Sequence, residues 1–189
     1  MKTAIIIHGM PSKENYFNPQ SPAQSNKHWL PWLQRQLILN DILAQTPEMP
    51  EAYRPDYEKW RSMFERFPVD EETTLIGHSA GGGFLLRWLS ENKVHVGKVA
   101  LVAPWINPKS EYPAPGFFDF TLDPDVVSRT AGMMMFVSND DEGEVLATVE
   151  NIKKEIKGVQ VQEFTGRGHF TMGDMKTEEF PELAQFLLS

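Results

Sequence analysis

The stretch Thr73-Thr74-Leu75-Ile76-Gly77-His78-Ser79-Ala80-Gly81 decides the fold of this chain. Its first four residues predict a short buried strand, and residues 82–89 carry apolar side chains at helical spacing. The pentapeptide between them has the pattern G-x-S-x-G. A serine on a tight strand-to-helix turn has a strained backbone, so only small residues fit two positions before and after it. The pattern therefore predicts that the Ser79 hydroxyl is exposed at the start of a helix.

Composition limits the classes of function. The 189 residues are 41% hydrophobic and 23% charged, which predicts one globular domain over residues 1–189 with a sizeable core. The formal net charge is −8, and an acidic chain without a stripe of clustered Lys and Arg is not typical of nucleic-acid binding. The chain has no cysteine, which excludes disulfides, thiolate zinc sites and cysteine nucleophiles.

The sequence predicts no targeting or membrane-spanning segment, and it lacks the common motifs for binding phosphate, zinc and dinucleotides. The apolar run at residues 4–7 is too short for a signal peptide, and no run approaches the roughly 18 apolar residues that span a bilayer. We therefore expect a cytoplasmic protein that does not bind a membrane. The sequence has no G-x-x-x-x-G-K-[ST] phosphate loop, no H-E-x-x-H zinc helix and no G-x-G-x-x-G opening a helix, so we expect neither a cofactor nor a metal.

Apolar runs and helical patterns alternate along most of the chain, which predicts a mainly parallel sheet with helices on both faces. Six strands match the core of the α/β-hydrolase fold, whose sites lie at the carboxyl ends of the strands. The predicted strands cover residues 4–8, 41–45, 73–77, 97–103, 133–138 and 159–164. The predicted helices cover residues 28–39, 56–67, the elbow to about 90, 144–157 and 178–188.

Residues 104–131 interrupt this alternation and are too short to form a large lid. The segment is rich in proline and aromatic residues, and two interpretations remain open. It could be a wall that shapes an apolar pocket over the site, or its rings could only cover the sheet. The residues concerned are Pro104, Trp105, Pro108, Tyr112, Pro113, Pro115, Phe117, Phe118 and Phe120.

A serine hydroxyl needs a neighbouring base, and that base needs an orienting acid. In α/β-hydrolases the acid and then the histidine follow the serine along the chain. Of the five histidines only His169 follows the late predicted strands, in a glycine-rich loop, so it is the candidate base. The acid should follow the strand at 133–138, where Asp140 and Asp141 are adjacent. Successive side chains point opposite ways from an extended backbone, and spacing leaves both candidates open.

Two backbone N–H groups are expected to form the oxyanion hole. One is that of Ala80, which follows the nucleophile, and the other is that of Met10, in the loop after the first strand. His8, at the start of the same loop, is interpreted as a structural partner beneath it.

These features together resemble the small serine hydrolases that include retinoblastoma-binding protein nine and the bacterial YdeN-like proteins. The resemblance spans nearly the whole chain. It rests on a strand that ends in His8-Gly9, the segment His28-Trp29-x-x-Trp32, the elbow at Gly77-His78-Ser79, the pair Asp140-Asp141 and the triplet Gly168-His169-Phe170. The family pattern implies that Asp141 is the acid of a Ser79–His169–Asp141 triad.

The chain departs from these relatives in two places. Residues 142–145, Glu-Gly-Glu-Val, replace the proline-containing turn that usually follows the aspartate pair, so the turn could be longer and Asp140 stays an alternative. An L-x-C-x-E motif for the retinoblastoma protein cannot occur in a chain without cysteine, so that partner is not transferred. We expect a serine hydrolase that cleaves small acyl esters. The alternatives are an amidase or small-peptide hydrolase with the same triad, and a non-catalytic binding protein.

Overall fold

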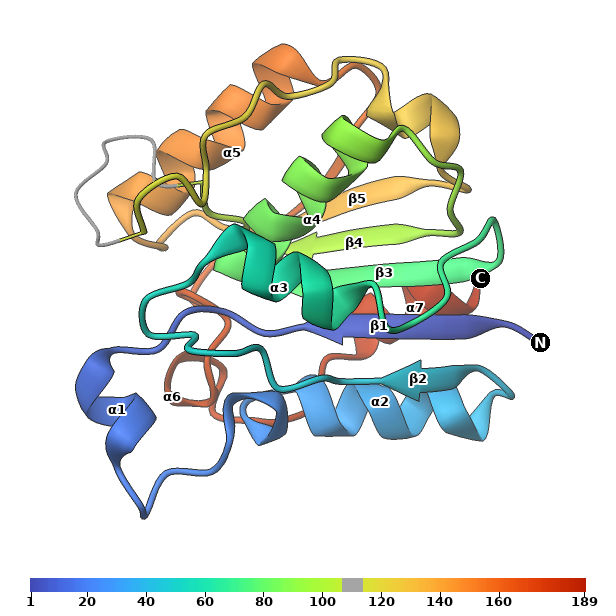
Figure 1. Cartoon of the computed structure of the whole chain (residues 1–189). Coiled ribbons are helices and arrows are strands. Elements are labelled where there is room, and N and C mark those ends of the chain that lie inside the picture. The colour runs from blue at the N-terminus through green and yellow to red at the C-terminus, as the bar shows by residue number, and fades with distance from the viewer. Residues whose placement is uncertain (107–113) are drawn as a thin grey trace.

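A parallel sheet forms the centre of the molecule. The structure is a computed structural model that describes residues 1–106 and 114–189. Its sheet has six strands in the order β2-β1-β3-β4-β5-β6. They are β1 (Thr3–Ile7), β2 (Leu43–Gln45), β3 (Thr73–His78), β4 (Val99–Val102), β5 (Met133–Ser138) and β6 (Gln160–Phe164). All neighbouring pairs are parallel, so the carboxyl ends share one edge of the sheet (Figure 1). The predicted six-stranded sheet is confirmed.

Helices cover both faces of the sheet, as the alternating pattern predicts. In Figure 1, α3, α4 and α5 lie in front of the strands, and α2 and α7 lie behind them. Each layer encloses its own apolar core against the sheet. The helices are α1 (Lys13–Phe17), α2 (Leu30–Leu39), α3 (Tyr57–Phe64), α4 (Ala80–Asn92), α5 (Gly143–Glu155), α6 (Met172–Met175) and α7 (Pro181–Leu188), with short 3-10 turns at Gln24–Asn26 and Val126–Arg129.

Helix ends differ from the predictions for identifiable reasons. The helix predicted at 56–67 begins at Tyr57, because the Asp56 side chain accepts a hydrogen bond from the Lys59 N–H and caps the helix. The helix predicted at 178–188 begins at Pro181, whose fixed φ and missing N–H suit the first helical position. The helices α1 and α6 were not predicted; they have five and four residues and bury none of them.

The proline-rich and aromatic segment at 104–131 divides between the two roles considered for it. Trp105 lines a cavity above the strand ends, as the wall interpretation expects. Phe117 is fully buried and meets the Trp60 ring at a centroid distance of 5.0 Å, so this ring belongs to the core. Phe118 packs edge-on against Trp105 at 5.1 Å and links the two. The predictions for Pro108, Tyr112 and Pro113 lie outside the described residues.

Candidate active site

Ser79 occupies a sharp turn between β3 and α4. Its φ of 54° and ψ of −123° lie outside the regions that L-residues ordinarily adopt. The Ser79 N–H donates to the Val102 carbonyl at 2.9 Å, and the Ser79 carbonyl accepts from the Trp105 N–H at 3.1 Å. A Cβ on Gly77 would lie 2.6 Å from the Gly82 nitrogen, so the close approach predicted for the elbow is present. The turn exposes the serine hydroxyl at the carboxyl edge of the sheet.

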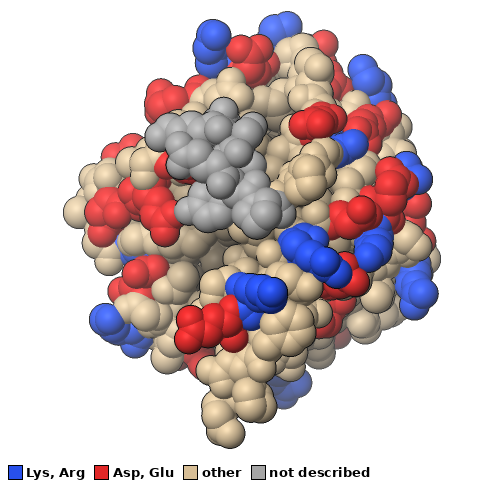
Figure 2. Space-filling model, turned by 60° about the vertical axis from the view of Figure 1, so that its left-hand side comes forward, with Lys and Arg blue, Asp and Glu red and all other residues tan. Residues whose placement is uncertain are grey.

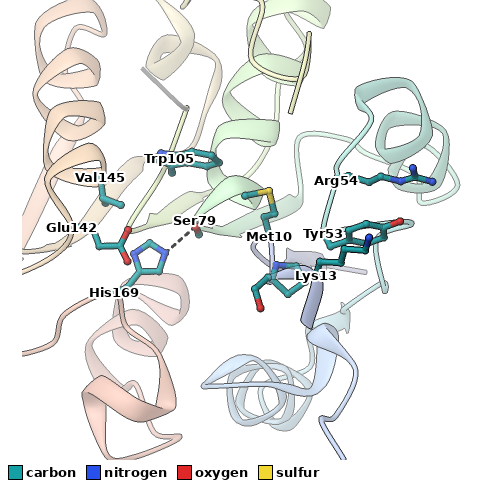
Figure 3. Close-up of a pocket in the computed structure, with 11 residues that line it drawn as sticks. Met10, Lys13, Tyr53, Arg54, Ser79, Trp105, Glu142, Val145 and His169 are labelled. Carbon is teal, nitrogen blue, oxygen red and sulfur yellow. Dashed lines mark hydrogen bonds between the residues drawn. The ribbon is translucent and has the colours of Figure 1, made fainter. Parts of the chain in front are cut away.

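The imidazole of His169 lies between Ser79 and Asp141. Its Nε2 is 2.9 Å from the Ser79 Oγ (Figure 3), and its Nδ1 is 3.0 Å and 3.1 Å from the two Asp141 carboxylate oxygens. The Asp141 side chain is 1% exposed and that of His169 is 23% exposed. The carboxylate is thus screened from water while the imidazole edge stays open to a substrate. The structure brings together all three residues that the family pattern implies.

Asp140 has a different set of partners. One of its oxygens accepts hydrogen bonds from the Ser138 hydroxyl at 2.5 Å, from the Gly166 N–H at 3.0 Å and from the Gly168 N–H at 3.3 Å. These bonds, the one from Ser138 first, lower the pKa of the Asp140 carboxyl. Asp140 therefore ties the end of β5 to the loop before His169, and Asp141 is the carboxylate that contacts the imidazole.

The main chain of His169 is held on both sides. Its N–H donates to the Asp174 carboxylate at 3.1 Å, and its carbonyl accepts from the His78 Nε2 at 2.8 Å. Asp174 belongs to a capping box with Thr171 at the start of α6. Neither support was predicted from the sequence. The T-x-x-D spacing of the capping box could have indicated the role of Asp174, whereas nothing local points to that of His78.

His28 and His78 are two further histidines near the site, and burial keeps both neutral. Burial, followed by the nearby His169 and His28, lowers the pKa of His78 well below its usual value. Burial and the neighbouring Lys27 lower the pKa of His28 to about 4. The unprotonated Nδ1 of His28 accepts a hydrogen bond from the Met172 N–H at 3.0 Å. Two neutral histidines therefore hold the backbone of this loop: His78 at His169, and His28 at Met172.

His8 supports the loop after β1, as the sequence analysis proposes. It is 2% exposed, and its Nε2 accepts from the Met49 N–H at 2.9 Å while its Nδ1 donates to the Gly9 carbonyl at 2.8 Å. Burial lowers its pKa.

The loop carries Met10, whose N–H has no hydrogen-bond acceptor among residues 1–106 and 114–189. The same holds, within those residues, for the N–H of Ala80.

A cavity of about 610 Å³ opens over Ser79 (Figure 3). Apolar side chains surround the serine, and charged side chains stand at the ends of the cavity. The lining residues are Met10, Pro11, Ser12, Lys13, Tyr53, Arg54, Ser79, Trp105, Glu142, Val145 and His169. The cavity can hold a small organic molecule in contact with the serine hydroxyl.

Two other features, a metal site and a membrane-spanning helix, have no candidate among residues 1–106 and 114–189. In the part of the chain that the structure describes, no group of three His, Asp or Glu side chains could hold a metal ion. No helix in that part is long and apolar enough to cross a membrane. Figure 2 shows acidic and basic side chains interspersed over the displayed face, with no continuous basic stripe there.

Solved structures of other proteins have the same fold. The crystal structure of the ydeN gene product of Bacillus subtilis gives a TM-score of 0.81 at 23% identity and covers 99% of this chain and 97% of that one. An alpha-beta serine hydrolase homologue from Coxiella burnetii gives 0.62 at 15% identity, with 99% and 83% covered. Est1E from Butyrivibrio proteoclasticus gives 0.66 at 15% identity, with 99% and 87% covered. The predicted α/β-hydrolase fold is confirmed.

Sequence comparison identifies the family. The chain is 25% identical over 179 residues to YdeN of Bacillus subtilis (strain 168), covering 89% of this chain and 86% of that protein. The sequence model of the family described as serine hydrolase matches residues 19–188, which include the elbow, the aspartate pair and the histidine loop. The chain therefore belongs to the serine hydrolase family, as its resemblance to the YdeN-like proteins implies.

Proposed function

We propose that this protein hydrolyses small acyl esters, with Ser79 as nucleophile, His169 as general base and acid, and Asp141 as the orienting carboxylate. The observation that carries the proposal is the unbroken series of contacts from the Ser79 Oγ through both nitrogens of His169 to Asp141. A base within hydrogen-bond reach of a serine, itself held by a buried acid, is the arrangement that activates a hydroxyl.

The reaction would proceed in two halves. The Ser79 Oγ attacks the ester carbonyl carbon as its proton passes to the His169 Nε2, and the N–H groups of Ala80 and Met10 bind the oxyanion. The same Nε2 then gives the proton to the departing alcohol oxygen, which leaves an acyl-enzyme on Ser79. Water then attacks the acyl carbonyl carbon and gives a proton to the His169 Nε2, which passes it to the departing Ser79 Oγ, so that the carboxylic acid and the free serine are released. Asp141 stays ionised throughout and stabilises the imidazolium.

The pocket supports a substrate with an apolar acyl or aryl part. Met10, Trp105 and Val145 place apolar side chains around Ser79. Est1E, which has the same fold, has been solved with ferulic acid bound. We therefore include an aromatic ester, methyl ferulate, among the substrates to be tested beside aliphatic ones.

Labelling with a fluorophosphonate probe tests the proposal directly. We expect the wild type and the exposed-serine control Ser62→Ala to be labelled, and Ser79→Ala to remain unlabelled. The hydrolysis of p-nitrophenyl esters of graded chain length then sizes the acyl site, and Ser79→Ala should lower kcat by several orders of magnitude. Well-folded wild-type protein that neither takes up the probe nor cleaves any ester would overturn the proposal and favour a binding protein on the hydrolase fold.

A further inference from the structure

The two ends of the cavity differ in charge. Figure 3 shows His169 and Glu142 on one side of Ser79, and Lys13 and Arg54 on the other. The orientation of a bound ester along this cavity rests on the proposed function, in which Ser79 attacks the ester and His169 is the general acid. Because His169 protonates the departing alcohol, the leaving group must lie on the His169 side. The acyl group therefore extends from Ser79 towards Lys13 and Arg54.

Two cations, Lys13 and Arg54, are among the side chains that line the acyl end of the cavity, and Glu142, the one lining carboxylate among the described residues, lies at the other end. Arg54 lies 3.4 Å from the Glu51 carboxylate, which Lys59 also contacts at 2.9 Å, so one carboxylate serves two cations. Lys13 forms no ion pair within residues 1–106 and 114–189. Lys13 therefore has its charge unpaired within those residues, and Arg54 shares one carboxylate with Lys59. Lys13 and Arg54 would attract an anionic group on a bound ligand.

The surface between Ser79 and these cations is largely apolar. Met10 and the Tyr53 ring line it, and Tyr53 is itself fixed by the rings of Tyr16 and Phe17 at centroid distances of 4.8 Å and 5.2 Å. A chain of methylene groups or an aromatic ring could lie on this surface without leaving buried polar groups unpaired.

We propose that the preferred substrate is an ester whose acyl group has an apolar middle and a carboxylate at its far end, bound by Lys13 and Arg54. Hydrolysis then breaks the acyl C–O bond with one water and yields an alcohol and a dicarboxylate. Both cations are exposed, with 59% of the Arg54 side chain open to solvent. An exposed ion pair contributes little, so each cation should change kcat/KM for the anionic ester by about 1.5- to 5-fold.

The test compares two esters that share the p-nitrophenyl leaving group and differ at the far end of the acyl chain, and it follows the release of p-nitrophenolate. They are the p-nitrophenyl monoester of suberic acid and the same molecule with its free carboxylate capped as a methyl ester. We expect the wild type to favour the anionic ester in kcat/KM by about 2- to 25-fold at low salt, and the preference to shrink as NaCl screens the cations. A preference for the capped ester, or a salt-independent ratio near one, would overturn the proposal.

Charge-neutralising variants locate the preference. We expect Lys13→Gln and Arg54→Gln each to lower the anionic-to-capped ratio, and the double variant to bring it close to one. The matched control is Lys157→Gln, at an exposed lysine paired with Asp125 on another part of the surface. The Lys157 variant should keep the wild-type ratio. An equal fall in all the variants would show that overall charge, and not the cavity end, sets the preference, and would refute the assignment.

The binding of monomethyl suberate to Ser79→Ala, measured by calorimetry, separates this inference from the proposed function. Weaker binding when Lys13→Gln is added would support the basic end even if no ester were cleaved. Suppose that the wild type cleaves the two esters at equal rates and that the Lys13 variant binds monomethyl suberate as tightly as its parent. Carboxylate binding by Lys13 and Arg54 would then be refuted, and the hydrolase proposal would stay intact. If the wild type cleaves neither ester and Ser79→Ala binds no monomethyl suberate, both the proposed function and the carboxylate site would be overturned.

Discussion

The Nε2 of His78 donates a hydrogen bond to the carbonyl oxygen of His169 over 2.8 Å. Because a carbonyl only accepts, this nitrogen carries the proton, and burial keeps the ring neutral. His78 precedes Ser79 directly, so one elbow presents the candidate nucleophile and also anchors the loop that carries its candidate base. The distance between Ser79 and His169 thus depends on a residue that touches neither reacting atom.

Replacing His78 should misplace the base. We expect His78→Phe, which keeps the ring but loses the donor, to lower kcat by about 10- to 100-fold with little change in KM, because small misalignments of catalytic groups are costly. His78→Gln carries an amide N–H near the same position and should recover much of the loss. Steady-state kinetics with p-nitrophenyl butyrate, beside circular dichroism, would check this. Equal kcat values for the two variants would contradict a role for the hydrogen bond.

The adjacent aspartates should respond differently to the same change. We expect Asp141→Asn to lower kcat by about 10³- to 10⁴-fold with the fold intact, because the amide cannot hold the imidazole in the required tautomer. Asp140→Asn removes a charge from the carboxylate that ties Ser138 to the Gly166 and Gly168 N–H groups. It should lower the melting temperature and reduce kcat by about tenfold at most. Steady-state kinetics and thermal unfolding of both variants would test this. A larger loss of kcat in Asp140→Asn than in Asp141→Asn would show that Asp140 is the orienting acid.

Most of the fold follows from local pattern. Buried parallel strands show as continuous apolar runs, and all six positions of β3 are buried. Hydrophobic periodicity does not predict the short helices α1 and α6, because no buried stripe marks them, and only the caps at Ser12 and Thr171 are local signs of where they begin. α1 is fixed instead by the Ser12 cap and by ring contacts of Tyr16 and Phe17 with Tyr53, far along the chain. These contacts are tertiary, and the local sequence contains no sign of them.

The candidate site could be predicted only in part, for the same reason. The elbow motif and the order of residues along the chain identify Ser79 and His169. Which of Asp140 and Asp141 faces the imidazole depends on how the turn after β5 packs against the loop before His169. The spacing of residues along the sequence does not determine that packing. The hydrogen bonds of His78 and His28 join residues that are 91 and 144 positions apart, so these contacts form only in the folded chain and no local pattern predicts them.

The glycines of the elbow should be irreplaceable for steric reasons. A Cβ on Gly77 would lie 2.6 Å from the Gly82 nitrogen and 2.7 Å from the Gly81 carbonyl, and backbone atoms cannot move aside cheaply. We expect Gly77→Ala to cost about 2–4 kcal/mol in the free energy of unfolding. Gly143→Ala is the matched control, because a Cβ there meets nothing within 4 Å. Urea denaturation would measure both, and similar stabilities would contradict the close packing of the elbow.

His28 should make stability depend on pH in a defined window. The folded chain holds the pKa of His28 near 4, whereas the unfolded value is close to 6.5. As the pH falls below 6.5, the unfolded state binds a proton that the folded state does not, so the free energy of unfolding decreases. The decrease continues to about pH 4, below which both states are protonated and the effect levels off. Protonation there also removes the acceptor for the Met172 N–H.

The variant His28→Asn isolates this contribution. Asparagine tolerates the φ of +58° at this position, and its side-chain oxygen can accept from Met172 without titrating. We expect the stability of the wild type relative to His28→Asn to fall between pH 7 and pH 4.5, measured by urea denaturation at several pH values. The titrating groups that do not contact His28 are present in both proteins and cancel in the difference. His78 contributes a residual pH dependence, because the nearby His28 helps to lower its pKa. His95→Asn, at an exposed histidine, is the control. A wild-type advantage that stays constant over this range would show that His28 is not held neutral by burial.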